Sequence, residues 1–328
     1  MAFLSLVLSS SADHLLASWL GLFGSTGSYR RVGPESGSQV FCAGSSLLVS
    51  ALLWQEVSES LGEGIENWTV GGSTPEIWEV FQQRRPNANI TIIGVSVYDL
   101  NEMRLSPGRA RWVPLSQTIS DLWVAGAEPA LSRRILAQYE LTYVQLLFPT
   151  AGDADKVLVG VRRKVAELLG RQADLEEHEG VLLQRSGVLE SGESTTKVSD
   201  MSSARLLRRI AVLRAENRGR HEFFNGPKSR AFHRMLFQAR RQGRVIVAVL
   251  PVARAYTEEF LDESAVASFE TALRDAMEIA PEATLVRLDR APGISNNGNF
   301  ADLVHMNLFG TRVSTPAFLM AVTERASQ

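Results

Sequence analysis

Five short segments of the chain are apolar at almost every position, and each is too short for an ordinary helix. A strand with one face in water alternates apolar and polar residues, whereas a continuous apolar run is typical of a strand covered on both faces. The runs are residues 40–43, 67–70, 90–94, 245–252 and 284–288. They predict five strands of a parallel sheet with helices packed on both sides.

Helical patterns lie between these runs. Residues 45–62 carry apolar side chains at helical spacing and end at a glycine, while residues 74–85 open with Thr-Pro-Glu and stop before a proline. Residues 232–243 and 263–281 form two more helical patterns, which precede the fourth and fifth strands. Strands that alternate with helices predict an α/β fold with three layers, α/β/α, around a five-stranded parallel sheet.

The middle of the chain has a different character. Residues 103–220 contain no convincing strand, and helical stretches dominate them. We therefore expect a helical insertion between the third and fourth strands, long enough to form a lid or to dock a membrane or protein partner. Residues 202–220 form a basic helix with a leucine and isoleucine stripe, and such a charge run is more typical of a solvated helix face than of a nucleic-acid contact.

The first residues are apolar, but they lack the features of a clear export signal. No basic residue precedes the apolar run, Asp13 and His14 interrupt it, and no clear small-residue cleavage site follows. The run is also short for a bilayer. Three interpretations stay open for residues 1–37: a degenerate membrane anchor, a helix packed on the surface of a domain that spans residues 38–328, or a start codon placed slightly wrongly relative to a real anchor.

The overall composition limits the kinds of partner and of site that the protein can have. The chain has 328 residues and a net charge of −2, so nothing in its charge calls for nucleic acid as a partner. A single cysteine, Cys42, excludes an intrachain disulfide and any multi-cysteine metal site. Hydrophobic residues make up 45% of the chain, as in an ordinary globular protein.

Polar residues and glycines follow several of the predicted strands. In an open parallel sheet, ligands bind beyond the carboxyl ends of the strands. Gly44-Ser45-Ser46 follows the first strand, a Gly-Gly pair at 71–72 the second, and residues 94–102, with sequence GVSVYDLNE, the third. Asp302 and His305 follow the fifth. The sequence thus gathers candidate chemical groups at one edge of the sheet.

Asp302 and His305 could form an acid–base pair. On a helical turn, a three-residue separation puts both side chains on one face, so the carboxylate can orient one imidazole nitrogen while the other faces a serine. Ser46 is the candidate serine. A serine at this position is also a favoured helix cap, and from this short motif alone capping is the stronger interpretation.

These motifs resemble those of the SGNH or GDSL-like hydrolase superfamily, including its polysaccharide O-acyltransferases and esterases. Gly44-Ser45-Ser46 matches the Gly-Asp-Ser element and makes Ser46 the nucleophile, and Gly72 matches the oxyanion-hole glycine. Residues 94–97 match the Gly-x-Asn-Asp block, and Asp302 with His305 matches the final Asp-x-x-His. The resemblance covers roughly residues 38–102 and 230–325 and implies a flavodoxin-like strand order.

The sequence departs from the family pattern where an oxyanion donor is expected. Ser96 stands in the place of the family's asparagine, and a serine hydroxyl is shorter and rotates freely. Loss of one good donor typically costs about 3 kcal/mol of transition-state stabilisation. Either Ser96 or the nearby Asn101 completes a hole with the backbone amides of Ser46 and Gly72, or the activity is slow, or the site is degenerate.

The resemblance implies ester chemistry through an acyl-serine intermediate. We expect an ester hydrolase or O-acyltransferase with Ser46, His305 and Asp302 as its triad, no metal or cofactor, and a small-molecule or carbohydrate ester, such as an acylated exopolysaccharide, as substrate. The same resemblance favours an extracytoplasmic or membrane-associated location. The alternative is a catalytically degenerate scaffold that binds a partner in polysaccharide assembly. A nucleotide-binding domain ranks behind both, because no loop carries a phosphate-binding fingerprint.

Overall fold

The computed structural model describes part of the chain. The described residues are 30–32, 40–69, 73–83, 88–104, 194–217, 220–223 and 225–326, with a few isolated positions elsewhere. The chain divides into two compact units, residues 1–27 with 106–186, and residues 28–105 with 187–328. Every element below belongs to the second unit. Most of the predicted N-terminal helical segment and most of the predicted insertion lie outside the described residues.

The second unit is built on a sheet whose strands follow the order β1-β3-β2-β4-β5-β6. Strands β2 to β6 are parallel to one another, which confirms the predicted α/β sheet, and β1 pairs antiparallel with β3 at one edge. The strands are β1 (Arg30–Val32), β2 (Val40–Ala43), β3 (Ile65–Asn67), β4 (Ile90–Val95), β5 (Arg244–Val249) and β6 (Thr284–Arg287).

Two strand predictions differ from the structure. Strand β1 was not predicted, because a three-residue segment gives no periodic signal. The second predicted strand, at 67–70, is wrong in its position, since β3 ends at Asn67. The buried strand contains Glu66 and Asn67, whose polarity hid it from an apolar pattern. After the strand, the Asn67 side chain accepts a hydrogen bond from the backbone N–H of Thr69 and turns the chain.

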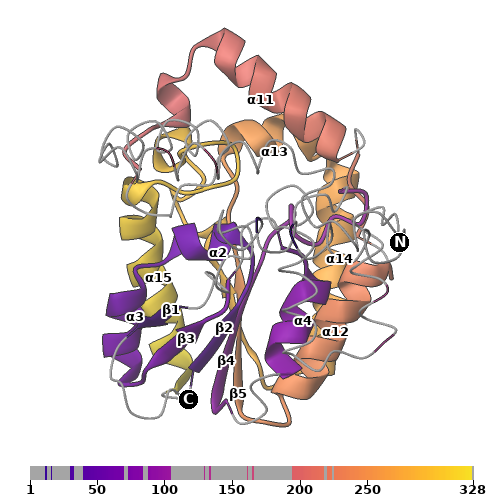
Figure 1. The fold of residues 1–328 in the computed structure, drawn as a ribbon, viewed down its shortest axis with the longest axis vertical. Helices are drawn as coiled ribbons and strands as arrows, with labels where there is room; N and C mark the ends of the chain where they lie inside the picture. Colours follow the sequence, from indigo (N-terminus) through magenta and orange to yellow (C-terminus); the bar gives the residue numbers. More distant parts are fainter. Residues whose placement is uncertain are drawn as a thin grey trace. The chain divides into compact units, whose positions relative to one another are not determined.

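Helices cover both faces of the sheet and give the three layers (Figure 1). One face carries α2, α3 and α15, of which α15 contacts both others, and the other carries α4, α12 and α14. Their bounds are α2 (Ser46–Ala51), α3 (Trp54–Leu61), α15 (Leu308–Ala326), α4 (Pro75–Gln83), α12 (Pro227–Ala239) and α14 (Glu263–Ile279).

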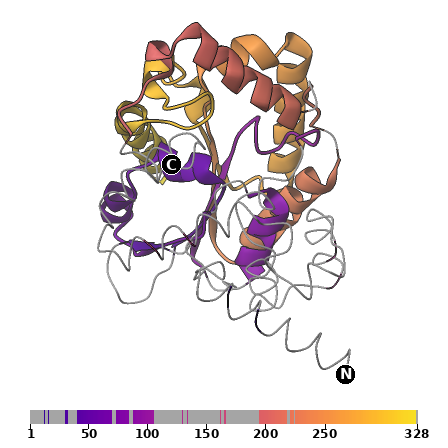
Figure 2. The same cartoon turned by 45° about the horizontal axis from the view of Figure 1, so that its top comes forward.

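Two further helices, α11 (Ser203–Glu216) and α13 (Arg254–Phe260), lie against each other beyond the layers (Figure 2). Three short 3-10 helices complete the described elements: η2 (Val198–Asp200), η3 (Leu288–Arg290) and η4 (Asn297–Asn299). Of the described helices, none combines the length and the apolar character that a membrane span requires.

The predicted single helix over 45–62 is two helices, because the C-terminal helix interrupts it. Leu52, which follows α2, has an extended backbone. The Thr311 hydroxyl of α15 donates to the carbonyl of Ser50 at 2.7 Å, and the Thr315 hydroxyl accepts from the N–H of Leu53 at 2.9 Å. These side chains satisfy backbone groups that a continuous helix would have paired internally, so α2 ends after six residues.

Helix α2 begins directly against the sheet because two glycines make room for Leu48. A Cβ added to Gly44 would lie 2.9 Å from the Leu48 Cβ, and one added to Gly94 on the adjacent strand would lie 2.7 Å from Leu48 Cδ1. Leu48 itself is fully buried. The pair of glycines therefore fixes how closely the first turn of α2 approaches the sheet between β2 and β4.

We predict that Gly94→Ala destabilises the protein by about 1–3 kcal/mol, because the new methyl group overpacks the contact with Leu48. Urea unfolding followed by circular dichroism measures the change. Gly298→Ala is the matched control, since the nearest atom to its added Cβ is the Asn296 Oδ1 at 3.5 Å. Equal unfolding midpoints for the two variants would contradict the proposed contact.

Candidate active site

Ser46 is the first residue of α2, directly after the sheet's first parallel strand and a single turn. The N-cap of the helix is Ser45, whose side chain accepts from the backbone N–H of Leu47 at 3.3 Å. The two serines thus divide the roles that the sequence left open. Ser45 caps the helix, and Ser46 presents its hydroxyl beyond the cap at the carboxyl end of β2, beside the point where the strand order reverses.

Ser46, His305 and Asp302 form a continuous hydrogen-bonded chain. The Ser46 Oγ lies 2.8 Å from the His305 Nε2, and the His305 Nδ1 lies 3.0 Å from Asp302 Oδ2 and 3.1 Å from Oδ1. The hydroxyl and the imidazole are 259 residues apart in sequence. The structure therefore brings the three predicted triad residues together in the order that nucleophilic catalysis requires.

The Asp302–His305 pair lies on a tight loop before α15, so the expected helical turn is wrong. An antiparallel bridge between Phe300 and Met306 closes the loop, and the N–H of Ala301 donates to the carbonyl of His305. Asp302 Oδ1 accepts from the backbone N–H groups of Val304 and His305 at 2.9 and 2.8 Å. This Asx-type turn gives the same three-residue proximity without a helix.

A residue that the sequence analysis did not single out completes the surroundings of Asp302. Arg209 of α11 donates from Nη2 to Asp302 Oδ2 at 2.6 Å. Burial alone would raise the pKa of Asp302, but His305, Arg209 and the Val304 N–H outweigh it and hold that pKa well below its usual range. Asp302 is therefore an ionised partner for the imidazole at neutral pH. The contact could not be predicted from the sequence, because Arg209 and Asp302 are 93 residues apart along the chain.

The segment that precedes α11 braces the histidine loop. The N–H of Val198 donates to the carbonyl of Phe300 at 2.8 Å, and the N–H of Leu308 donates to the carbonyl of Ser194 at 3.0 Å. The Asn307 side chain adds a bond of 2.9 Å to the carbonyl of Thr196. Residues at the end of the predicted insertion thus belong structurally to the site.

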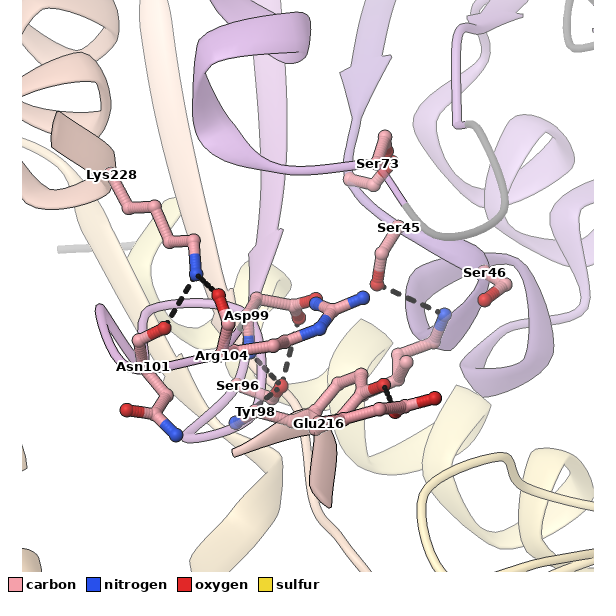
Figure 3. A network of polar contacts seen from close by, with 12 residues as sticks. Ser45, Ser46, Ser73, Ser96, Tyr98, Asp99, Asn101, Arg104, Glu216 and Lys228 are labelled. Carbon is pink, nitrogen blue, oxygen red and sulfur yellow. Dashed lines mark hydrogen bonds and ion pairs between the residues drawn. The ribbon is translucent and has the colours of Figure 1, made fainter. Parts of the chain in front are cut away.

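Among the described residues, the structure does not join the predicted oxyanion donors in one hydrogen-bonded set as it does the three triad residues. Gly72 lies outside the described residues. The Ser96 hydroxyl donates to Asp99 Oδ2 at 2.8 Å and accepts from the N–H groups of Tyr98 and Asp99 (Figure 3). Because its single proton is directed to Asp99, Ser96 has no second proton to offer a substrate.

Asn101 also has a local role. Its carbonyl oxygen accepts from the N–H groups of Met103 and Glu222, and its amide nitrogen donates to the carbonyl of Arg220. Lys228, buried in α12, donates to the main-chain carbonyls of Asn101 and Arg104 at 2.6 and 2.8 Å (Figure 3). These bonds hold the loop after β4 in one shape, and they engage the Asn101 side chain on both of its polar atoms.

A buried ion pair lies in this loop. Asp99 is fully buried, and its Oδ1 lies 3.6 Å from the Arg104 Nη1. Burial raises the pKa of Asp99, while Arg104 and the hydroxyls of Ser96 and Ser45 lower it in part. The serine that caps α2 is therefore electrostatically linked to the same carboxylate that fixes Ser96.

The comparisons with known proteins add no family to this geometry: no family model matches the chain, and neither does any curated protein. Within the described ranges, no group of three or more histidine, cysteine, aspartate or glutamate side chains could hold a metal ion. The arrangement of Ser46, His305 and Asp302 is thus the observation that bears on chemistry.

We predict that Ser96→Ala lowers the free energy of unfolding by about 1–3 kcal/mol, because it removes the hydroxyl that donates to Oδ2 of the buried Asp99. Ser199→Ala is the matched control: its hydroxyl also donates to a neighbouring aspartate, Asp200, but on an exposed surface. Chemical denaturation at pH 7 compares the two variants. If both variants lose the same small amount of stability, the Ser96–Asp99 hydrogen bond does not stabilise the loop after β4.

We also predict that the stability contributed by Asp302 disappears in acid. Its pKa is lower in the folded than in the unfolded state, so the unfolded state binds more protons and stability falls as the pH drops. The loss begins near the unfolded pKa of about 4 and continues below it. Between pH 6 and pH 3, Asp302→Asn should lose less stability than the wild type in urea titrations. Asp200→Asn serves as an exposed control, and a wild-type-like slope for Asp302→Asn would contradict the assignment.

Proposed function

We propose that the protein is a serine-dependent ester hydrolase or O-acyltransferase that works through an acyl-serine intermediate. The observation that carries the proposal is the hydrogen-bonded chain from Ser46 through His305 to Asp302, with distances of 2.8 and 3.0 Å. Its position at the carboxyl edge of a parallel sheet is where ligands bind in such folds. The motif resemblance to SGNH or GDSL-like hydrolases supports the same chemistry.

In the first half-reaction, Ser46 Oγ attacks the ester carbonyl and His305 Nε2 takes its proton. Asp302 receives the hydrogen bond of the His305 Nδ1–H and stabilises the imidazolium that forms. The tetrahedral intermediate then collapses, the C–O bond to the alcohol breaks, and the imidazolium returns its proton to the departing oxygen. The acyl group remains on Ser46.

In the second half-reaction, His305 takes a proton from an incoming hydroxyl, which attacks the acyl-serine carbonyl. The bond between the acyl carbon and Ser46 Oγ then breaks, and the imidazolium returns the proton to Ser46 Oγ. Water in this role completes hydrolysis, whereas a sugar hydroxyl completes O-acyl transfer. The resemblance favours an acylated carbohydrate or exopolysaccharide as the substrate, and an extracytoplasmic or membrane-associated setting.

The negative charge of the tetrahedral intermediate needs backbone donors. Ser46 begins α2, so its own N–H belongs to the first turn, whose N–H groups have no partner within the helix. The family pattern adds the N–H of Gly72. We assign the hole to these backbone groups, because the Ser96 hydroxyl donates its proton to Asp99 and the Asn101 side chain is bonded to Met103, Glu222 and Arg220.

A second function keeps the sheet as a non-catalytic scaffold for a partner in polysaccharide assembly. The engaged Ser96 hydroxyl favours it, because the residue that stands in the place of the family's asparagine then directs its proton to Asp99 rather than to a substrate. The intact triad geometry argues against it. A direct measurement of turnover separates the two.

We predict that the purified protein hydrolyses p-nitrophenyl acetate, and that Ser46→Ala and His305→Ala each lower kcat/KM at least about 1,000-fold. Ser264→Ala, an exposed serine on α14, is the control and should match the wild type. A fluorophosphonate probe should also label Ser46 covalently, which mass spectrometry of the peptide detects.

Turnover that is absent, or that survives both triad substitutions in folded protein, would refute the proposed hydrolysis. Labelling by the probe without turnover would instead indicate a reactive serine in a transferase that excludes small esters. Neither turnover nor labelling would leave the scaffold function as the better account.

A further inference from the structure

Arg209 occupies an unusual position beside the triad. Helix α11 packs on the core through Leu206, Ile210 and Leu213, whose spacing places them on one face of the helix. Arg209 extends from this docked helix to Asp302, with 26% of its side chain exposed against 8% for the aspartate. The contact is therefore largely shielded from water, where a charge pair is stronger than on an open surface.

The two carboxylate oxygens of Asp302 accept different hydrogen bonds. Oδ1 accepts the backbone N–H groups of Val304 and His305, which fix the carboxylate in its loop. Oδ2 accepts both the Arg209 guanidinium at 2.6 Å and the closer of the two His305 Nδ1 contacts at 3.0 Å. A permanent cation and the imidazole thus share one oxygen of the same carboxylate.

We propose that Arg209 is a positioning residue for the triad, which holds Asp302 Oδ2 in place and withdraws part of its negative charge from His305. Its effect on catalysis rests on the function proposed above, whereas its effect on the imidazole does not need turnover. An aspartate relieved of part of its charge stabilises an imidazolium less. In a variant without the Arg209 charge, the full charge of Asp302 would act on the imidazole through the same oxygen and would stabilise its protonated form more strongly.

The other charges near His305 support this role for Arg209. Asp99, on the loop after β4, also interacts electrostatically with His305, but it has its own buried cation in Arg104. Asp302 has Arg209. These two described carboxylates that act on the imidazole are thus each matched by one arginine, one from the loop after β4 and one from α11.

The test compares the pH dependence of kcat/KM for p-nitrophenyl acetate in the wild type, Arg209→Met, Arg209→Lys and Arg208→Met. Removing the charge in Arg209→Met should move the acid limb of the profile upward by roughly half to one pH unit. Arg209→Lys keeps the charge and should keep the limb near the wild-type position. Arg208→Met is the matched control, because Arg208 is exposed and bonds to the carbonyl of Ala204 in its own helix.

A purely structural role predicts another result, a lower rate at every pH with the acid limb unmoved, and that result would overturn the proposal. NMR of the His305 imidazole nitrogens against pH, assigned with His305→Gln, gives the second readout. The same upward movement in Arg209→Met supports the proposal, and identical titration in both proteins refutes it. If the wild type shows no Ser46-dependent turnover, the proposed function fails while the NMR titration still decides the role of Arg209.

Discussion

The site depends on the contact of Leu48 with two glycines. Gly44 ends the turn after β2 and Gly94 lies in β4, and neither has a side chain to keep Leu48 away from the sheet. Helix α2 can therefore begin within three residues of the end of β2, with Ser45 as its cap and Ser46 as its first residue. A larger residue at either glycine would push α2 outward and move the Ser46 hydroxyl away from the imidazole.

The histidine half of the site is held from elsewhere in the chain. Its loop is fixed internally by the Asx-type turn of Asp302, and externally by hydrogen bonds from residues 194–198. Arg209 then joins α11 to the same loop. The segment that follows the middle of the chain thus both supports the loop and contributes charge to it. The serine half and the histidine half of the site are joined by the Ser46–His305 hydrogen bond and by the packing of α15 on α2.

The sequence was informative where local patterns decide structure. Buried apolar strands and the glycine after β2 are local signals, and from them the parallel sheet and Ser46 could be predicted. Asp302 and His305 were found from their spacing, although on the wrong local structure, since an Asx-type turn brings residues i and i+3 together as a helix does. Arg209 could not be found, because its role arises from tertiary packing of α11 that no nearby residue encodes.

The role of the loop after β4 could not be predicted from the sequence either. Ser96 could be matched to a family position, but only the fold reveals that Asp99 takes its proton. The C-terminal helix adds a consequence for biogenesis. Because His305 lies 259 residues after Ser46, the serine is synthesised long before the imidazole to which it is hydrogen-bonded. Helix α15, which supplies the hydroxyls that terminate α2, follows later still. A nascent chain thus carries Ser46 without its hydrogen-bond partner, and the Ser46–His305 contact can form only after every strand of the described sheet has been synthesised.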